Sequence, residues 1–181
     1  GQEFIFVADN LGTVAAKLSS IDVNHEGWSA DLEQIIGINL EAKIRNVSYT
    51  WLGDRWVESR SIDPWIANKP SLLEMKFGFY DFAIDDIPFV TIQNMRTINT
   101  NSDEFLLLDT KLNTTPKLGD SEYTHHVEIL VRIAMDPDSD GKITSGKTTN
   151  SNYQGNGADV KTENQRGVLT LTFNWDQYNA Q

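Results

Sequence analysis

An acidic loop beginning at residue 136 carries the side chains best suited to bind a metal ion. Asp136, Asp138 and Asp140 occupy alternate positions, and Gly141 follows the third of them. Alternating carboxylates can converge on a hard cation such as Ca²⁺, and the glycine permits the sharp turn that a calcium loop needs. The twelfth position, where such loops carry a bidentate carboxylate, is Lys147. Two interpretations stay open, a weak calcium site and a solvated acidic turn, and the sequence requires no other cofactor.

A second group of possible metal ligands is His125, His126 and Glu128. These residues fall in a segment that alternates like a strand, where neighbouring side chains point to opposite faces. His126 and Glu128 would therefore face one way and His125 the other, so the three cannot bind one ion. We expect a structural or surface role for them.

Paired carboxylates could also perform acid–base chemistry, as in glycosidases, where two carboxyl groups lie ~5–10 Å apart. Asp85-Asp86 and the carboxylates between Glu26 and Glu33 are the candidates. With 26 acidic residues in the chain, such neighbours arise by coincidence, and sequence spacing does not establish a pair. The zinc-protease signature His-Glu-x-x-His is absent. We expect no enzymatic activity.

Tryptophans could instead bind a sugar through a flat, exposed platform of indole rings. The five candidates are Trp28, Trp51, Trp56, Trp65 and Trp175. The alternative is that the indoles fill the core or anchor loops.

Most elements that must position these residues look like strands. Residues 36–44, 127–135 and 168–175 alternate between apolar and polar side chains, the period of a half-buried β-strand. The apolar phase shifts at Asn46, which predicts a β-bulge or a crossing between sheets. Only residues 30–36 could form a helical turn. With eight to ten strands and no βαβ rhythm, the sequence predicts an all-β, antiparallel β-sandwich or jelly roll.

The N-terminus carries four consecutive large apolar residues, Phe4, Ile5, Phe6 and Val7. They could form an ordinary first strand in the subunit's own sheet. They could also be a donor strand that adds to a groove in the next subunit, where main-chain hydrogen bonds provide affinity. The second interpretation divides the chain into a donor strand with its linker, residues 1–12, and a jelly-roll domain, residues 13–181.

Composition limits the partners. A chain of 181 residues suits one domain with a sizeable core. The net charge of −11 leaves no positive surface for nucleic acid or an anionic membrane. The chain has no cysteine, which excludes disulfides, zinc–thiolate sites and thiol nucleophiles. No apolar run approaches the ~20 residues that span a bilayer, so we expect no membrane span in the mature chain.

Several features suggest an exported protein. The chain begins with Gly1 rather than Met, which we interpret as the result of signal-peptide removal. Sequons begin at Asn46 and Asn113, which makes both residues glycosylation candidates. We expect a secreted protein, extracellular or at the cell surface.

The C-terminal region resembles a known family. A loop containing Tyr153, Gln154, Gly155 and Asn156 precedes a strand containing Leu169, Leu171 and Phe173, and Gln177 follows. This arrangement resembles the C-terminus of the TasA/camelysin family of secreted biofilm-matrix fibre proteins, which includes archaeal bundling pilin-like relatives. The resemblance implies a jelly-roll subunit that polymerises by donor-strand exchange.

From the sequence we therefore expect a structural subunit of an extracellular filament, a biofilm-matrix fibre or pilus. Its partners would be identical subunits in a head-to-tail homopolymer. One alternative is a carbohydrate-binding β-sandwich module with a calcium loop, which predicts coplanar exposed indoles. Another is a viral jelly-roll coat subunit, which predicts closed shells.

Overall fold

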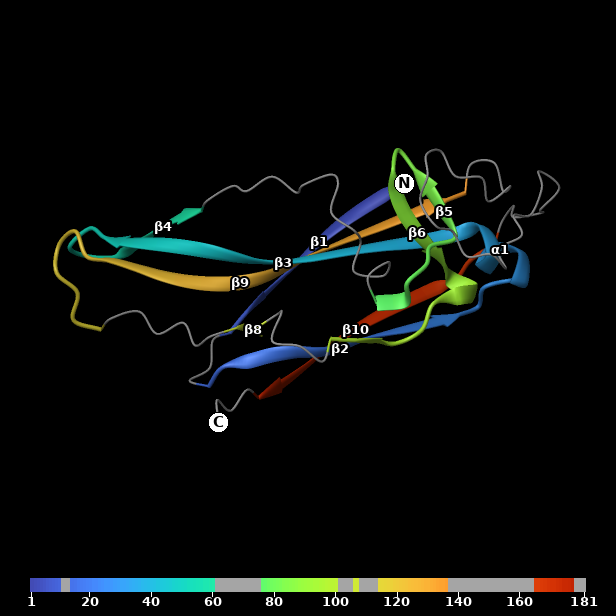
Figure 1. The fold of residues 1–181 in the computed structure, drawn as a ribbon. Coiled ribbons are helices and arrows are strands. Elements are labelled where there is room, and N and C mark those ends of the chain that lie inside the picture. Colours follow the sequence, from blue (N-terminus) through green and yellow to red (C-terminus); the bar gives the residue numbers. More distant parts are fainter. Residues whose placement is uncertain (11–13, 61–75, 101–105, 108–113, 137–164, 178–181) are drawn as a thin grey trace.

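The computed structural model describes residues 1–10, 14–60, 76–100, 106–107, 114–136 and 165–177. Within them, only the backbone is described for residues 43–47, 59–60, 106–107 and 123–126. The elements in chain order are β1 (Gln2–Asp9), β2 (Ala16–Glu26), α1 (Ala30–Ile35), β3 (Ile36–Trp51), β4 (Trp56–Arg60), β5 (Phe82–Ile84), β6 (Ile87–Thr91), the 3₁₀ turn η1 (Ile92–Asn94), β7 (Ile98–Asn99), β8 (Leu106–Leu107), β9 (Ser121–Met135) and β10 (Val168–Gln177) (Figure 1).

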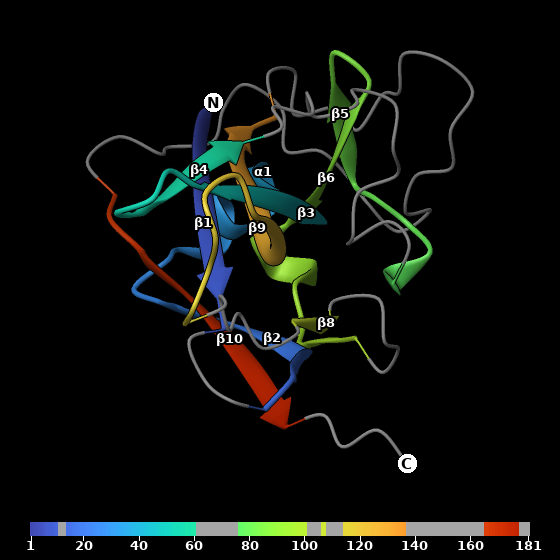
Figure 2. The same cartoon turned by 90° about the vertical axis from the view of Figure 1, so that its left-hand side faces the viewer.

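The strands form two antiparallel sheets that pack together. The larger sheet has the order β1-β9-β3-β6-β5, with β4 also paired to β3, and the smaller has the order β10-β2-β7, with β8 also paired to β2. Figure 2 shows them as two layers, with β1, β9 and β3 in one and β2 and β10 in the other. The described strands close no barrel. The expected antiparallel, β-rich architecture is confirmed.

The expected helical turn is also confirmed. Helix α1 spans Ala30–Ile35 and begins at Ser29, whose side-chain oxygen accepts a hydrogen bond from the Leu32 N–H. Asp31 and Glu33 lie in the first turn, where carboxylates interact favourably with the helix N-terminus.

The core lies between the two sheets and is built from alternating apolar residues. Ile38 and Leu40 of β3 are fully buried, as are Leu18 and Ile21 of β2. The inward residues of β9 are Val127, Ile129 and Val131, which are at most 2% exposed. Burying one such side chain stabilises the fold by about 1.5–3 kcal/mol.

An arm extends the larger sheet past the smaller one. It consists of β4 and the adjoining ends of β3 and β9 (Figure 1). The pairing of β3 with β9 runs without interruption from Ile36↔Met135 to Thr50↔Ser121. The prediction of a β-bulge or a crossing between sheets at Asn46 is therefore wrong, since β3 stays in the larger sheet throughout. Among the described strands, no second sheet faces the arm, and the apolar phase changes there: Trp51 packs against Trp56 of β4, with ring centroids 5.6 Å apart.

A tight hairpin covers part of the outer face of the larger sheet. Asp85 and Asp86 connect β5 to β6 with φ of 49° and 64°, the left-handed backbone of a two-residue hairpin turn. The Phe82 and Phe89 rings stack 5.3 Å apart. A Cβ added to Gly37 would lie 2.6 Å from the Phe82 ring, so the absence of a side chain permits this close packing.

Candidate functional site

Strand β1 forms one edge of the larger sheet. It pairs with β9 along its whole length, from Gln2↔Ile133 to Asp9↔His126. Among the strands that the structure describes, none pairs with the opposite edge of β1. The residues predicted to form a donor strand thus lie in an edge strand, which in this single chain pairs with the chain's own β9.

The large apolar side chains of β1 are only about half buried, although each residue of the strand has a register partner on β9. Phe4, Ile5, Phe6 and Val7 are 44%, 58%, 45% and 46% exposed. An aromatic side chain carries about 150–250 Å² of surface, so the two phenylalanines alone leave on the order of 200 Å² exposed. Apolar patches of a few hundred Å² on a single subunit commonly mark interaction sites.

The two faces of β1 meet different surroundings. Phe4 and Phe6 share a face with the inward residues of β9, and the Phe6 ring lies 5.7 Å from the Phe173 ring of β10. Ile5 and Val7 share the outer face with the buried residues Leu130 and Glu128 of β9. Because both faces are apolar, β1 lacks the polar-out, apolar-in pattern of a half-buried strand.

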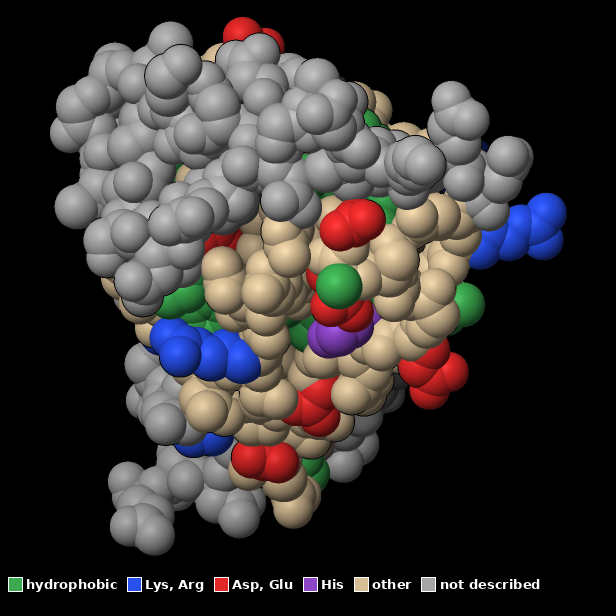
Figure 3. All heavy atoms as spheres, turned by 90° about the vertical axis from the view of Figure 1, so that its right-hand side faces the viewer, with side chains coloured by type: hydrophobic (Ala, Val, Ile, Leu, Met, Phe, Trp, Pro, Cys, Tyr) green, Lys and Arg blue, Asp and Glu red, His purple; other side chains and the backbone are tan. Residues whose placement is uncertain are grey.

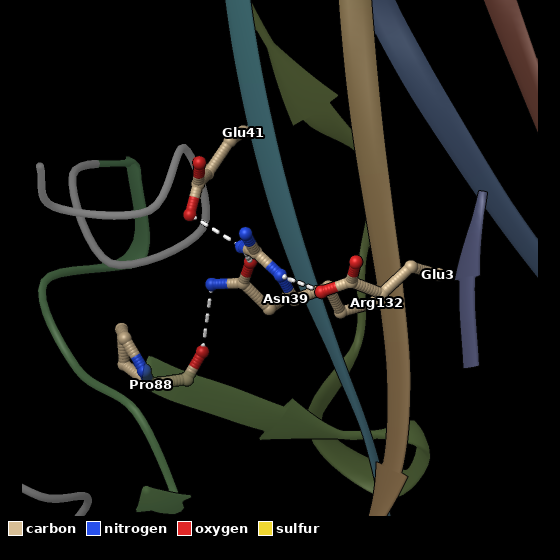
Figure 4. Close-up of polar contacts among 5 residues, drawn as sticks. All are labelled: Glu3, Asn39, Glu41, Pro88 and Arg132. Atoms are coloured by element: carbon tan, nitrogen blue, oxygen red, sulfur yellow. Dashed lines mark hydrogen bonds and ion pairs between the residues drawn. The ribbon is translucent and has the colours of Figure 1, made fainter. Parts of the chain in front are cut away.

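A polar cluster on the outer face ties β1 to the sheet (Figure 4). The Arg132 guanidinium of β9 donates through Nε to Glu3 Oε1 at 2.7 Å. It also donates through Nη1 to Glu41 Oε1 at 2.5 Å and to Asn39 Oδ1 at 3.0 Å, both on β3. Asn39 is fully buried, and its Nδ2 donates to the Pro88 carbonyl at 2.9 Å. We call Arg132, Asn39, Glu41 and Glu3 the Arg132 cluster.

The cluster keeps its cation charged. The side chains of Arg132 and Glu41 are 14% and 12% exposed, whereas Glu3 is 63% exposed. Burial by itself lowers the pKa of Arg132, but the hydrogen bonds to Glu3 and Glu41 outweigh it, so the pKa is raised above the usual arginine value. The site can therefore hold a carboxylate at any physiological pH.

Two hollows lie near these elements. One, of about 230 Å³, separates the start of β1 from the β5–β6 hairpin and is lined by residues that include Glu3, Ile87, Phe89 and Arg132. The other, of about 500 Å³, lies where β10 begins, and Leu32 of α1 is among its lining residues. There the Trp28 Nε1 donates to the Val168 carbonyl at 2.9 Å.

The predicted calcium loop falls largely outside the described residues. Asp136 is 5% exposed, and its N–H donates to the Ile35 carbonyl at 2.8 Å. Asp138 and Asp140 lie outside the described part of the chain. Within that part, no three His, Cys, Asp or Glu side chains gather in a way that could hold a metal ion. Calcium binding stays a prediction.

Of the other residues considered for catalysis or sugar binding, those discussed here form a turn or pack against neighbouring side chains. Asp85 and Asp86 form the hairpin turn described above. The indoles of Trp51 and Trp56 meet at 61°, an edge-on pair rather than a flat platform. Trp65 lies outside the described residues.

Near α1, His25 Nδ1 lies 3.0 Å from Glu33 Oε1. At this end of the molecule acidic side chains are spread over the face rather than gathered in one cluster (Figure 3).

The family-motif residues are divided between described and undescribed segments. Leu169, Leu171 and Phe173 are half-buried on β10 and pack against the core, and Gln177 ends the strand. Tyr153, Gln154, Gly155 and Asn156 lie outside the described residues, as does Asn113. Asn46 lies in β3 opposite His125, and its side chain is not described.

The sequence analysis missed the Arg132 cluster. Alternation had already placed Arg132 and Glu41 on the polar faces of their strands, and Glu3 precedes the apolar run of β1. Opposite charges on the polar faces of three strands were the available signal. It could not be used before the pairing of those strands was known.

Comparisons with models of protein families, with curated proteins and with solved structures identify no match. The resemblance to the TasA/camelysin family therefore stays a prediction. In the part of the chain that is described, no helix has the length and apolar character to cross a membrane. The fold and site define a class of protein, a β-rich domain with an apolar edge strand whose large side chains are about half exposed.

Proposed function

We propose that this protein is a structural subunit of an extracellular filament, in which β1 of one copy occupies the β9 edge of the next. The observation that carries the proposal is the mismatch within β1. Its backbone pairs at every position from Gln2 to Asp9, yet the four large apolar side chains stay 44–58% exposed. Because the strand's own subunit buries these side chains only in part, little core packing is lost when β1 leaves that subunit for a neighbour.

Exchange of β1 between copies costs little because the same contacts re-form. A β1 strand from a second copy would make the same ladder with β9 and the same Phe6–Phe173 contact. The free energies of the exchanged and unexchanged forms then differ only through the linker and through the entropy lost on association. A higher subunit concentration compensates for that entropy. Polymerisation is expected above a threshold concentration of subunits.

The connection between β1 and β2 permits such exchange. Residues 10–15 separate Asp9 from Ala16. Extended chain spans at most ~3.3–3.6 Å per residue, so this connection reaches roughly 20 Å. A strand that leaves one subunit and enters another makes a heterologous contact, which does not close and propagates head to tail.

The remaining features agree with a filament subunit. Two packed antiparallel sheets suit a jelly roll, the fold that the family resemblance implies. The net charge of −11 opposes indiscriminate aggregation of subunits that expose apolar strands. The chain lacks cysteine, so its assembly would rely on strand pairing rather than disulfides. We propose a secreted location for the assembled protein.

The test compares the full chain with a variant that lacks residues 1–9. Both are concentrated and imaged by negative-stain electron microscopy, and their masses are measured by light scattering. We expect filaments from the full chain and monomers from the deletion variant. A synthetic Gln2–Asp9 peptide added to the deletion variant should raise its melting temperature without restoring filaments, because a free peptide fills the groove but carries no second subunit.

Two results would overturn the proposal. The full chain could stay monomeric at every concentration, or filaments could persist after deletion of residues 1–9. Either outcome would show that β1 belongs permanently to its own subunit, or that another surface drives assembly.

A further inference from the structure

We infer that the Arg132 cluster selects the incoming strand and sets its register by binding the carboxylate of Glu3 from a second copy of this chain. The inference rests on the proposed function. It adds the chemical group that the β9 edge recognises and the residues that recognise it.

The receiving half of the cluster is complete without β1. Arg132 lies on β9, while Asn39 and Glu41 lie on β3, and both β3 residues hydrogen-bond the same Nη1. Asn39 is in turn held by the Pro88 carbonyl. These contacts fix the guanidinium plane before any strand arrives. The Nε–H then points toward the position that β1 occupies, where its partner is Glu3 Oε1.

The incoming half consists of Glu3 alone. Of the residues in β1, only Glu3 and Asp9 carry charge. Glu3 is directly opposite Arg132, and Asp9 is opposite His126 at the other end of the strand. A planar guanidinium held by buried partners favours a carboxylate at one position and in one orientation.

The strand needs such a device because its apolar pattern does not define its register. Strand register is strongly specified where one face is apolar and the other polar, and weakly specified where both faces are alike. Phe4 to Val7 form an uninterrupted apolar run with both faces exposed. A slip by two residues would keep the faces but place Ile5 opposite Arg132. It would leave the guanidinium Nε without its carboxylate, so the cluster penalises the slipped register.

Charge exchange tests the inference. Two single variants are prepared, Glu3→Arg and Arg132→Glu, and a third variant carries both exchanges. Each single variant alone places like charges opposite one another, whether β1 pairs within its own subunit or with another copy. We expect the concentration at which it forms filaments to lie about tenfold or more above that of the equimolar mixture. In an equimolar mixture, each donor strand finds the complementary groove on the other variant, and filaments should return as alternating copolymers.

Two controls separate the possible outcomes. The variant with both exchanges should polymerise by itself, which shows that each exchanged residue is compatible with folding. Asp54→Arg, a charge reversal in the exposed β3–β4 turn, should leave polymerisation unchanged. Labelling the two single variants with different fluorophores reports whether the mixed filaments contain both chains.

The outcomes distinguish this inference from the proposed function. If the single variants polymerise as well as their equimolar mixture, or if the mixture fails while the doubly exchanged variant succeeds, Glu3 does not select the strand between copies. Strand donation itself would survive the first of these results. If the unmodified chain forms no filament, both the function and this inference fail.

Discussion

Strands β1 and β10 are the edge strands of their sheets and touch through Phe6 and Phe173, yet they are held in different ways. β10 pairs with β2 from Val168 to Gln177, and its inward residues pack against the core while Thr170 and Thr172 face solvent. β1 has an equally complete backbone ladder but exposes large apolar side chains on both faces. β10 is therefore integral to the core, whereas β1, whose large side chains are about half exposed, is the strand that our proposal assigns to exchange between copies.

The largest difference between the two strands should appear when their touching rings are removed. Phe173→Ala should lower the unfolding free energy by about 3 kcal/mol because the ring packs against the main core. Phe6→Ala should lower it by about 1 kcal/mol or less, since that side chain is 45% exposed. Urea denaturation of dilute monomer measures both values. Equal losses would mean that β1 is as integral to the fold as β10.

Replacing Arg132, which pairs with Glu3 of β1, should have the next largest effect on stability. Arg132→Gln leaves Glu41 nearly buried without its cationic partner, at a cost of about 2 kcal/mol. The raised pKa means that the contribution of Arg132 is fully present below the arginine pKa of the unfolded chain and is lost only as the pH rises through the folded value. The stability difference between the two proteins should therefore be flat from pH 6 to 9, as measured by denaturation across that range. A slope in this window would assign the effect to another group.

Proline substitution in β1 sharpens the comparison by separating its two edges. In an edge strand, alternate N–H groups point to the neighbouring strand and to open space. Ile5→Pro and Phe6→Pro should therefore differ in their effect on the unfolding free energy. The substitution that removes an N–H directed at β9 should lower it by about 1–2 kcal/mol, and the other should lower it little. Thermal denaturation of dilute protein reports the difference. If both substitutions are equally damaging, a second strand pairs with the outer edge of β1.

The smallest effects concern exposed groups. Glu3→Gln should lower stability by about 0.5 kcal/mol at low salt and by less at 1 M salt, because this carboxylate is 63% exposed and its charge is screened. Thr172→Ser, on the solvent face of β10, is the matched control and should change stability by less than about 0.5 kcal/mol under both conditions. A salt-independent loss for Glu3→Gln would indicate a packing contribution instead.

Local patterns predicted much of the fold. Alternation with a period of two identified β3, β9 and β10 and assigned the inward face of β10, because side chains on a strand alternate whatever the strand's partners are. Residues 30–36, predicted as the one helical turn, contain α1, which Ser29 caps. The same local logic failed at Asn46, where the phase of apolar residues changed without a bulge. The change falls in the arm, which no second sheet faces among the described strands.

The sequence by itself determined that β3, β9 and β10 are strands, which of their faces are apolar, and that an apolar run lies near the N-terminus. Only the tertiary structure decided that this run is an edge strand with exposed side chains, and that Glu3 meets Arg132 across 129 residues of chain. The physical reason is that periodicity is a property of neighbouring residues, whereas strand order and cross-strand pairs depend on contacts between distant segments, which local patterns do not encode.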